Sequence, residues 1–206
     1  MAYTSASTAT KRRIFVKPLD RGTEPKLVRT HPGHVHVTSW SPDGRWLAAV
    51  ELAWTTAANV WAIPLDGGEA VSVAHAAMDP QFSPDGKWIA YASRESGRAE
   101  VYAVAFPELT SRRQVSADGG RAPAWDRQGR FVYYLQQGYL VAHEVRLGTG
   151  LTVGRATRLF ATPASGFEVA PGNRFVLTEP NPQSADEPLH LIVNWFTELR
   201  TKVPAR

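Results

Sequence analysis

The sequence contains no cysteine among its 206 residues. Disulfide bonds, thiolate nucleophiles and zinc–thiolate sites are therefore excluded together. No apolar run is long enough to cross a membrane as a helix, and residues 1–15 lack the hydrophobic segment of a secretory signal. We therefore expect no membrane insertion, and a cytoplasmic location if Met1 is the biological start.

Signatures of catalysis are also missing. The sequence has no Gly-x-Ser-x-Gly, no His-Glu-x-x-His, no phosphate-binding Walker loop and no kinase catalytic motif. Gly148, Gly150 and Gly154 come close to a dinucleotide-binding fingerprint, but they fall between predicted strands, where no helix follows. We expect no enzymatic activity, no cofactor and no bound metal.

Positive charge is present but not concentrated. The formal net charge is +4, and only residues 11–13 form a basic cluster. Proteins that bind nucleic acid usually gather Lys and Arg into a stripe with interleaved aromatic residues. The scattered charge therefore predicts no nucleic-acid partner.

A five-residue segment recurs along the chain. Trp40–Gly44 reads Trp-Ser-Pro-Asp-Gly, residues 82–86 read Phe-Ser-Pro-Asp-Gly, and weaker copies lie at residues 125–129 and 169–173. The first two copies are 42 residues apart and the second and third are 43 apart, so the period is nearly constant. Ser-Pro-Asp-Gly suits a tight hairpin turn, which explains Asp43 and Asp85 better than a catalytic pair of carboxylates does.

Short apolar segments rich in β-branched and aromatic residues flank each turn. Several such strands in a repeat of about 42 residues are typical of one β-propeller blade. We therefore predict an all-β fold, a β-propeller of four-stranded antiparallel blades. The predicted segments are, for the second strands, residues 46–50, 88–92, 131–135 and 175–177; for the third, 60–65, 101–106, 140–145 and 189–193; and for the fourth, 70–73, 114–116 and 157–160.

These hairpins resemble the PD40 (WD40-like) repeats of TolB-type propellers. Residues 81–104, followed by Gln-Val-Ser-Ala-Asp-Gly-Gly at 114–120, are more narrowly similar to the C-terminal propeller region of bacterial serine/threonine kinases, as is the segment at 193–199. The resemblance implies a binding or sensory scaffold without its own catalyst. It also implies an extracytoplasmic location if the chain is the tail of a membrane-anchored kinase.

Three regions are expected along the chain: a disordered tail at residues 1–10, the propeller at 11–194, and a short C-terminal helix and tail at 195–206. The strand count fits two arrangements. The chain is expected either to close as a ring of four to five blades with an irregular joint, or to be the C-terminal part of a larger propeller truncated at its start, which has an open end. We favour the second, which predicts self-association through open blade edges.

Three residues are candidate ligand-binding residues. His34 and His36 lie on one side of a predicted strand, where they would serve as metal ligands or as polar residues at the rim of the central channel. Trp54 lies in a loop that is unusually apolar. We expect it either to contact a ligand or to pack against a neighbouring blade.

The expected function is a non-catalytic scaffold that binds a protein, a peptide or a small ligand, as the sensory part of a kinase-like protein. Two alternatives stay open: an accessory propeller of a hydrolase or peptidase, and a free-standing TolB-like interaction protein.

Overall fold

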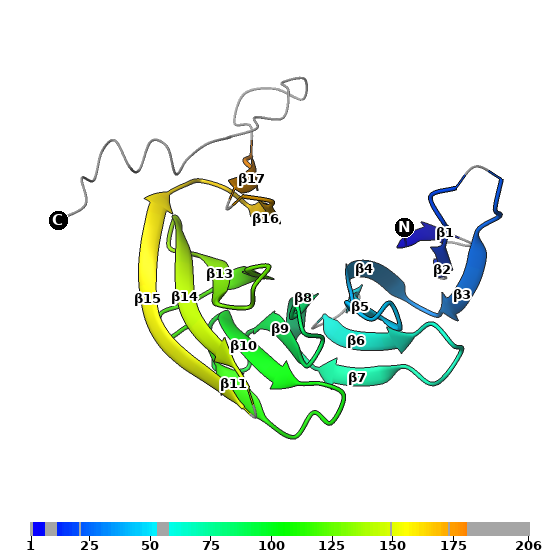
Figure 1. The fold of residues 1–206 in the computed structure, drawn as a ribbon, viewed down its shortest axis with the longest axis horizontal. Coiled ribbons are helices and arrows are strands. Elements are labelled where there is room, and N and C mark those ends of the chain that lie inside the picture. The colour runs from blue at the N-terminus through cyan, green and yellow to red at the C-terminus, as the bar shows by residue number, and fades with distance from the viewer. Residues whose placement is uncertain are drawn as a thin grey trace.

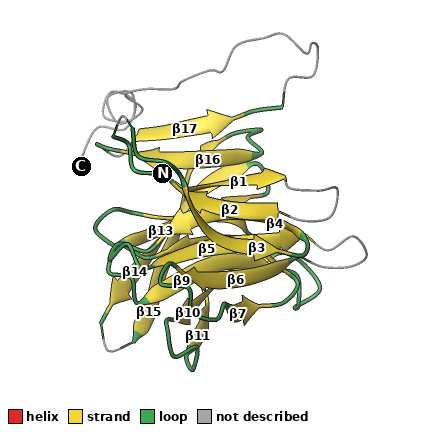
Figure 2. Ribbon diagram, turned by 90° about the vertical axis from the view of Figure 1, so that its right-hand side faces the viewer, coloured by secondary structure: helices red, strands yellow, loops and turns green. Residues whose placement is uncertain are grey.

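The computed structural model describes residues 2–6, 12–20, 22–52, 58–148, 150–172 and 174–180. All regular structure in these ranges is β-strand (Figure 2). The described residues contain no helix long and apolar enough to cross a membrane. The predicted strand at 189–193 and helix at 195–206 lie outside the described residues. Five antiparallel sheets follow one another around an open arc, with the N-terminal sheet at one end and the C-terminal sheet at the other (Figure 1).

Three of the sheets are complete four-stranded blades. In each, the first strand lies on the concave side of the arc and the last on the convex side (Figure 1). Their strands are β4 (His34–Trp40), β5 (Trp46–Leu52), β6 (Asn59–Pro64) and β7 (Val71–Ala74); β8 (Ala77–Phe82), β9 (Trp88–Ser93), β10 (Glu100–Ala105) and β11 (Arg112–Gln114); and β12 (Arg121–Trp125), β13 (Phe131–Gln136), β14 (Tyr139–Leu147) and β15 (Leu151–Ala161).

The end sheets are smaller. The N-terminal sheet has three strands, β1 (Ala2–Ala6), β2 (Arg12–Val16) and β3 (Lys26–His31), and the C-terminal sheet has two, β16 (Gly166–Ala170) and β17 (Arg174–Thr178). The predicted disordered tail at 1–10 is thus corrected at residues 2–6. This segment pairs along its length with β2, and Tyr3 stacks on Phe15 with ring centroids 5.6 Å apart, contacts that composition cannot reveal.

The repeated turns have the predicted chemistry. In the first copy, the Gly44 N–H donates to the Ser41 carbonyl at 2.9 Å, and Gly44 takes a positive φ of 73°. The Asp43 carboxylate accepts bonds from the Ser41 hydroxyl at 2.5 Å and from the Arg45 N–H at 3.0 Å, and these bonds lower the pKa of Asp43. The second copy repeats these contacts at Ser83 and Asp85. These carboxylates therefore stabilise turns.

The middle strands of the blades are buried on both faces. Every residue of β9 is buried, as are all but the last of β10. Each blade packs between two neighbours, which explains why these strands are continuous apolar runs in the sequence. Four buried clusters fill the interfaces between successive sheets.

A buried histidine gives one blade a predictable dependence on pH. His143 Nε2 donates to the Gly154 carbonyl at 3.1 Å, so Nδ1 is left to accept from the Tyr134 hydroxyl at 3.2 Å. Burial lowers the pKa of His143, and the Gly154 carbonyl and Glu144 offset this only in part. The neutral ring is therefore the form that the fold favours.

We expect the free energy of unfolding to fall as the pH drops below about 6.5, where the histidine of the unfolded chain takes up its proton first. The loss is about 1.4 kcal/mol per unit of pKa depression and ends below the folded pKa. Urea unfolding across pH 5–8 measures it, and His143→Gln should flatten the profile. An unchanged profile in this variant would contradict the assignment.

Candidate functional site

The concave wall of the arc is built from the first strands of successive blades. A pocket of about 430 Å³, here called the channel pocket, lies along this wall between β4, β8, β12 and the C-terminal sheet. Its lining is formed by Val37, Thr38, Asp79, Gln81, Ala122, Pro123, Ala124, Ser165, Gly166, Phe167, Glu168 and Thr178.

Equivalent residues of the repeat meet in this pocket. Asp79 and Ala122 each lie three residues before the aromatic residue that begins a turn segment. Both have a positive φ, 55° and 50°, and the pairing with the next strand shifts at both places. These bulges bend the inner strands at the same height in two neighbouring blades.

Hydrogen bonds between blades fix the inner strands to one another. The Thr38 hydroxyl donates to the Pro80 carbonyl at 2.7 Å, and the Trp125 indole N–H donates to the Gln81 carbonyl at 3.0 Å. Arg121 donates to the carbonyls of Ala164 at 3.0 Å and Ser165 at 2.6 Å. The wall is therefore held in place before any ligand binds.

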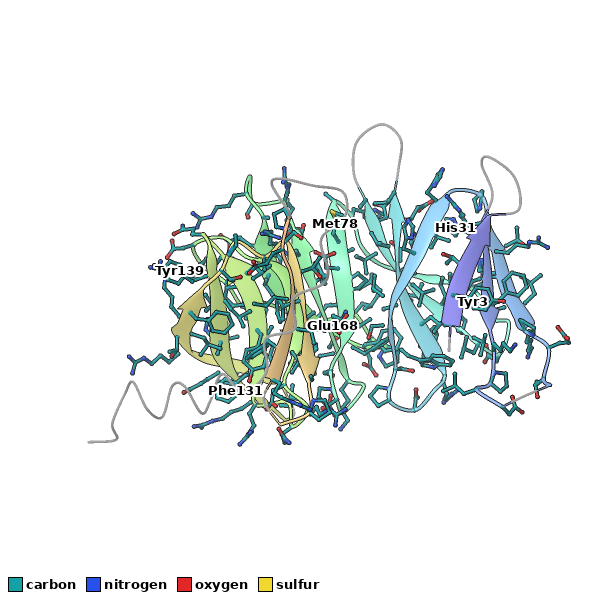
Figure 3. All side chains as sticks on the ribbon, turned by 90° about the horizontal axis from the view of Figure 1, so that it is seen from above. Tyr3, His31, Met78, Phe131, Tyr139 and Glu168 are labelled. Carbon is teal, nitrogen blue, oxygen red and sulfur yellow. The ribbon has the colours of Figure 1, made fainter. Side chains whose placement is uncertain are left out.

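A second pocket, the rim pocket, opens where the inner strands meet one face of the arc. It has a volume of about 480 Å³ and contains the half-exposed Met78. Met78 lies on one face of the arc, Phe131 on the opposite face and Glu168 between them (Figure 3). The pocket is lined by Ala58, Ala76, Met78, Asp79, Ala92, Ser93, Arg94, Ala99 and Arg121.

The rim pocket combines apolar walls with three charged groups. Arg121 donates to the carbonyls of Ala164 and Ser165, whereas the exposed Arg94 forms no ion pair within the described part of the chain. Burial raises the pKa of Asp79. The hydrogen bond from the Ala122 backbone N–H and the positive charge of Arg121 both lower this pKa, but they offset the effect of burial only in part. The lining of the pocket therefore includes a guanidinium that forms no ion pair among the described residues, and a carboxylate whose charged form is destabilised.

A third pocket of about 510 Å³ lies on the opposite face, around Phe131. Its cation Arg130 already bonds Asp126 at 3.3 Å and lies over the Phe131 ring. Glu144 and Arg146 add charges of both signs. We therefore place the candidate site at the rim pocket and the adjoining channel pocket, which share Asp79.

The three residues predicted from sequence have different outcomes. His34 lies on β4, half-buried, with Nδ1 3.1 Å from the Arg12 guanidinium, so this nitrogen accepts. His36 lies two residues further on the same strand and is exposed. Neither lines the two pockets, and no cluster of three metal-ligating residues occurs in the described ranges. Trp54 lies in residues 53–57, outside the described part.

Sequence reasoning missed Asp79, Arg94 and Arg121. Asp79-Pro80 recurs as Ala122-Pro123 at a spacing of 43 residues. This repetition could have marked the inner strands, whose bounds the sequence did not give. The two arginines carried no motif, because only the folded arc brings them to the same rim.

Comparison with known proteins agrees with this architecture. The family model PD40, the TolB beta propeller domain, matches residues 1–179. An uncharacterised protein of Agrobacterium fabrum, Atu1656, is 26% identical over 97 residues, 46% of this chain and 32% of that protein.

Two solved structures share the fold. A protein assigned to TolB from Agrobacterium tumefaciens is 22% identical with a TM-score of 0.58, and covers 77% of this chain and 60% of its own. TolB from Acinetobacter baumannii is 16% identical with a TM-score of 0.67, and covers 88% of this chain and 46% of its own. This chain thus spans less than two thirds of the length of each of these three proteins.

Proposed function

The chain belongs to the TolB β-propeller (PD40) family, and we propose that it is a non-catalytic scaffold that binds a peptide through the rim pocket and the channel pocket. The observation that supports this is Arg94, which lines a pocket together with four alanines and forms no ion pair with any described residue. Pockets of this kind, largely apolar with a few placed polar groups, are typical of ligand sites.

The chemistry of the rim pocket favours a segment with a small apolar side chain and a carboxylate. Arginine binds a carboxylate through two parallel N–H bonds, which suits the C-terminal group of a peptide. The four alanines form an apolar wall against which a small apolar side chain would pack beside this carboxylate. Asp79 is in place to accept a backbone N–H of the same ligand.

We expect N-acetylated tripeptides that end in alanine or valine with a free carboxyl group to bind, and their C-terminal amides to bind much more weakly. Arg94→Gln should weaken binding of the free acids about tenfold or more, because a hydrogen bond to a charged group is lost. Isothermal titration of the full chain measures both effects. Arg155→Gln, on exposed β15, is the matched control and should bind as the parent does.

Two results would contradict this proposal. One is equal affinity for the acids and the amides, and the other is an equal effect of the two arginine substitutions. Thermal unfolding of each variant, measured in parallel, separates a loss of binding from a loss of fold.

The finer assignment, that this scaffold is the sensory part of a serine/threonine kinase-like protein, is a proposal supported by the sequence similarity at residues 81–104 and 114–120. The family match concerns the propeller and does not bear on it. An antibody against residues 12–180 tests it through the mass of the product in cells: a band near 22.6 kDa would contradict it. A much larger band whose peptides include a kinase domain would support it.

A further inference from the structure

Among the described residues, the N-terminal sheet has no counterpart of the strand that begins every complete blade. Its outermost strand β3 leads into β4, and the order β1-β2-β3 places β1 where β5 and β9 stand in the complete blades. β1 also contacts β4, as β5 contacts β8. Nothing pairs with the inner edge of β1 within the described residues, so its outward backbone N–H and C=O groups face a position that no described strand occupies, here called the empty position.

The buried indole N–H of Trp40, next to this position, has no hydrogen-bond acceptor among the described residues. Trp40 and Trp125 occupy the same place in their repeats, directly before the turn. The Trp125 indole N–H donates to the carbonyl of Gln81, on the inner strand of the preceding blade. The Trp40 indole N–H is buried and has no such acceptor among the described residues. Its acceptor would come from an inner strand, which the described part of the N-terminal sheet does not include.

Two arginines lie beside the empty position. Arg12 and Arg13 are on β2, where Arg13 is exposed and Arg12 bonds His34 Nδ1. The nearby carboxylate of Glu51 is already engaged, because it accepts the Trp61 indole N–H at 2.9 Å and lies 3.8 Å from His31 Nε2.

The two faces of the empty position differ. On one face, Ala2 packs against the core of Ile14, Val35 and Leu47. On the other, Tyr3 and Arg13 lie beside Phe15, with the Arg13 guanidinium 5.6 Å from the ring centroid. An added strand would therefore present small apolar residues to one face and acidic residues to the other, since side chains alternate along a strand.

We propose that the inner edge of β1 is a strand-addition site for an extended acidic segment of another protein. The segment pairs with β1 through its backbone, and one of its carbonyls accepts the Trp40 indole N–H. Strand addition of this type derives affinity from the main chain and specificity from alternate side chains. The site is separate from the rim pocket, so a test of strand addition does not depend on whether the rim pocket binds a peptide.

The test uses the full chain and a fluorescein-labelled octapeptide of alternating Glu and Val, followed by fluorescence polarisation. We expect binding that weakens with salt, and no binding of the matched Lys-Val octapeptide. Trp40→Phe should weaken the affinity by about three- to tenfold, the effect of one hydrogen bond. Trp125→Phe is the control, because it removes an indole N–H that already has its acceptor, and it should leave the affinity unchanged.

Hydrogen exchange locates the bound segment. Amides of residues 2–6 should gain protection when the Glu-Val octapeptide binds, and the Trp40 indole resonance should shift. Equal binding of the Lys-Val peptide, equal effects of the two tryptophan variants, or no added protection of β1 would each overturn the proposal. Protection of the β1 amides in the absence of peptide would also overturn the proposal, because the edge of β1 would then already be paired. Sedimentation would identify the partner: a dimer would indicate a second copy of the chain, and a monomer another segment of the same chain.

Discussion

Trp125→Ala is expected to lower the free energy of unfolding by about 3–5 kcal/mol. The side chain is 7% exposed and packs in the buried cluster between the blade of β8–β11 and the blade of β12–β15. Alanine would leave a large cavity there and would also strand the Gln81 carbonyl that accepts the indole N–H. Urea unfolding followed by circular dichroism measures the change.

The magnitude matters because a domain of this size has a total stability of only about 5–15 kcal/mol. Trp125→Phe keeps most of the packing and loses the bond to Gln81, so we expect a loss of about 1–2 kcal/mol. If Trp125→Ala lowers the free energy of unfolding by less than about 1 kcal/mol, the buried cluster around Trp125 does not join the two blades as described.

In a repeat protein the damage from Trp125→Ala need not spread evenly. Each blade contacts only its neighbours, so the interfaces contribute separately to stability. Loss of the contact between these two blades should expose the amides of β12–β17 to hydrogen exchange more than those of β4–β7. A uniform increase along the chain would instead indicate that the arc unfolds as one unit.

The turns and the central strands were predictable from local chemistry. Ser-Pro-Asp-Gly supplies its own hydrogen bonds, so Ser41 and Asp43 form the same turn wherever the flanking strands allow it. Strands buried on both faces have no polar side, and Trp88–Ser93 therefore stands out as an apolar run. Both signals lie within a few residues of the chain.

The ends of the arc and the candidate site were not predictable in this way. β1 has the composition of a tail, with Ser, Thr and Ala, and is a strand because β2 offers it an edge and Phe15 offers a ring. The rim pocket draws Ala58, Arg94 and Arg121 from three different blades. Such residues become neighbours only through the curvature of the whole arc, which no local pattern encodes.

Glu100→Ala is expected to lower the free energy of unfolding by about 2–4 kcal/mol, measured by urea unfolding. Glu100 is 1% exposed at the start of β10. Its carboxylate accepts hydrogen bonds from Arg98 Nε at 2.5 Å, from the Gly119 N–H at 2.9 Å and from the Ser116 hydroxyl. It therefore ties β10 to the connection that leads into β12, and alanine would leave the buried Ser116 hydroxyl and the half-buried Gly119 N–H without this acceptor.

Three further variants distinguish this account from a simple loss of charge. Glu69 pairs with Arg29 at the surface with its side chain 96% exposed, so Glu69→Ala should cost less than about 1 kcal/mol. Glu100→Gln keeps one acceptor oxygen but places an amide N–H next to other donors. Its loss of unfolding free energy should therefore lie between the losses for Glu69→Ala and Glu100→Ala. Arg98→Ala leaves the bonds from Ser116 and Gly119 in place and should cost less than Glu100→Ala. A larger loss in the Arg98 variant would mean that the ion pair, and not the buried hydrogen bonds, stabilises this junction between the blades.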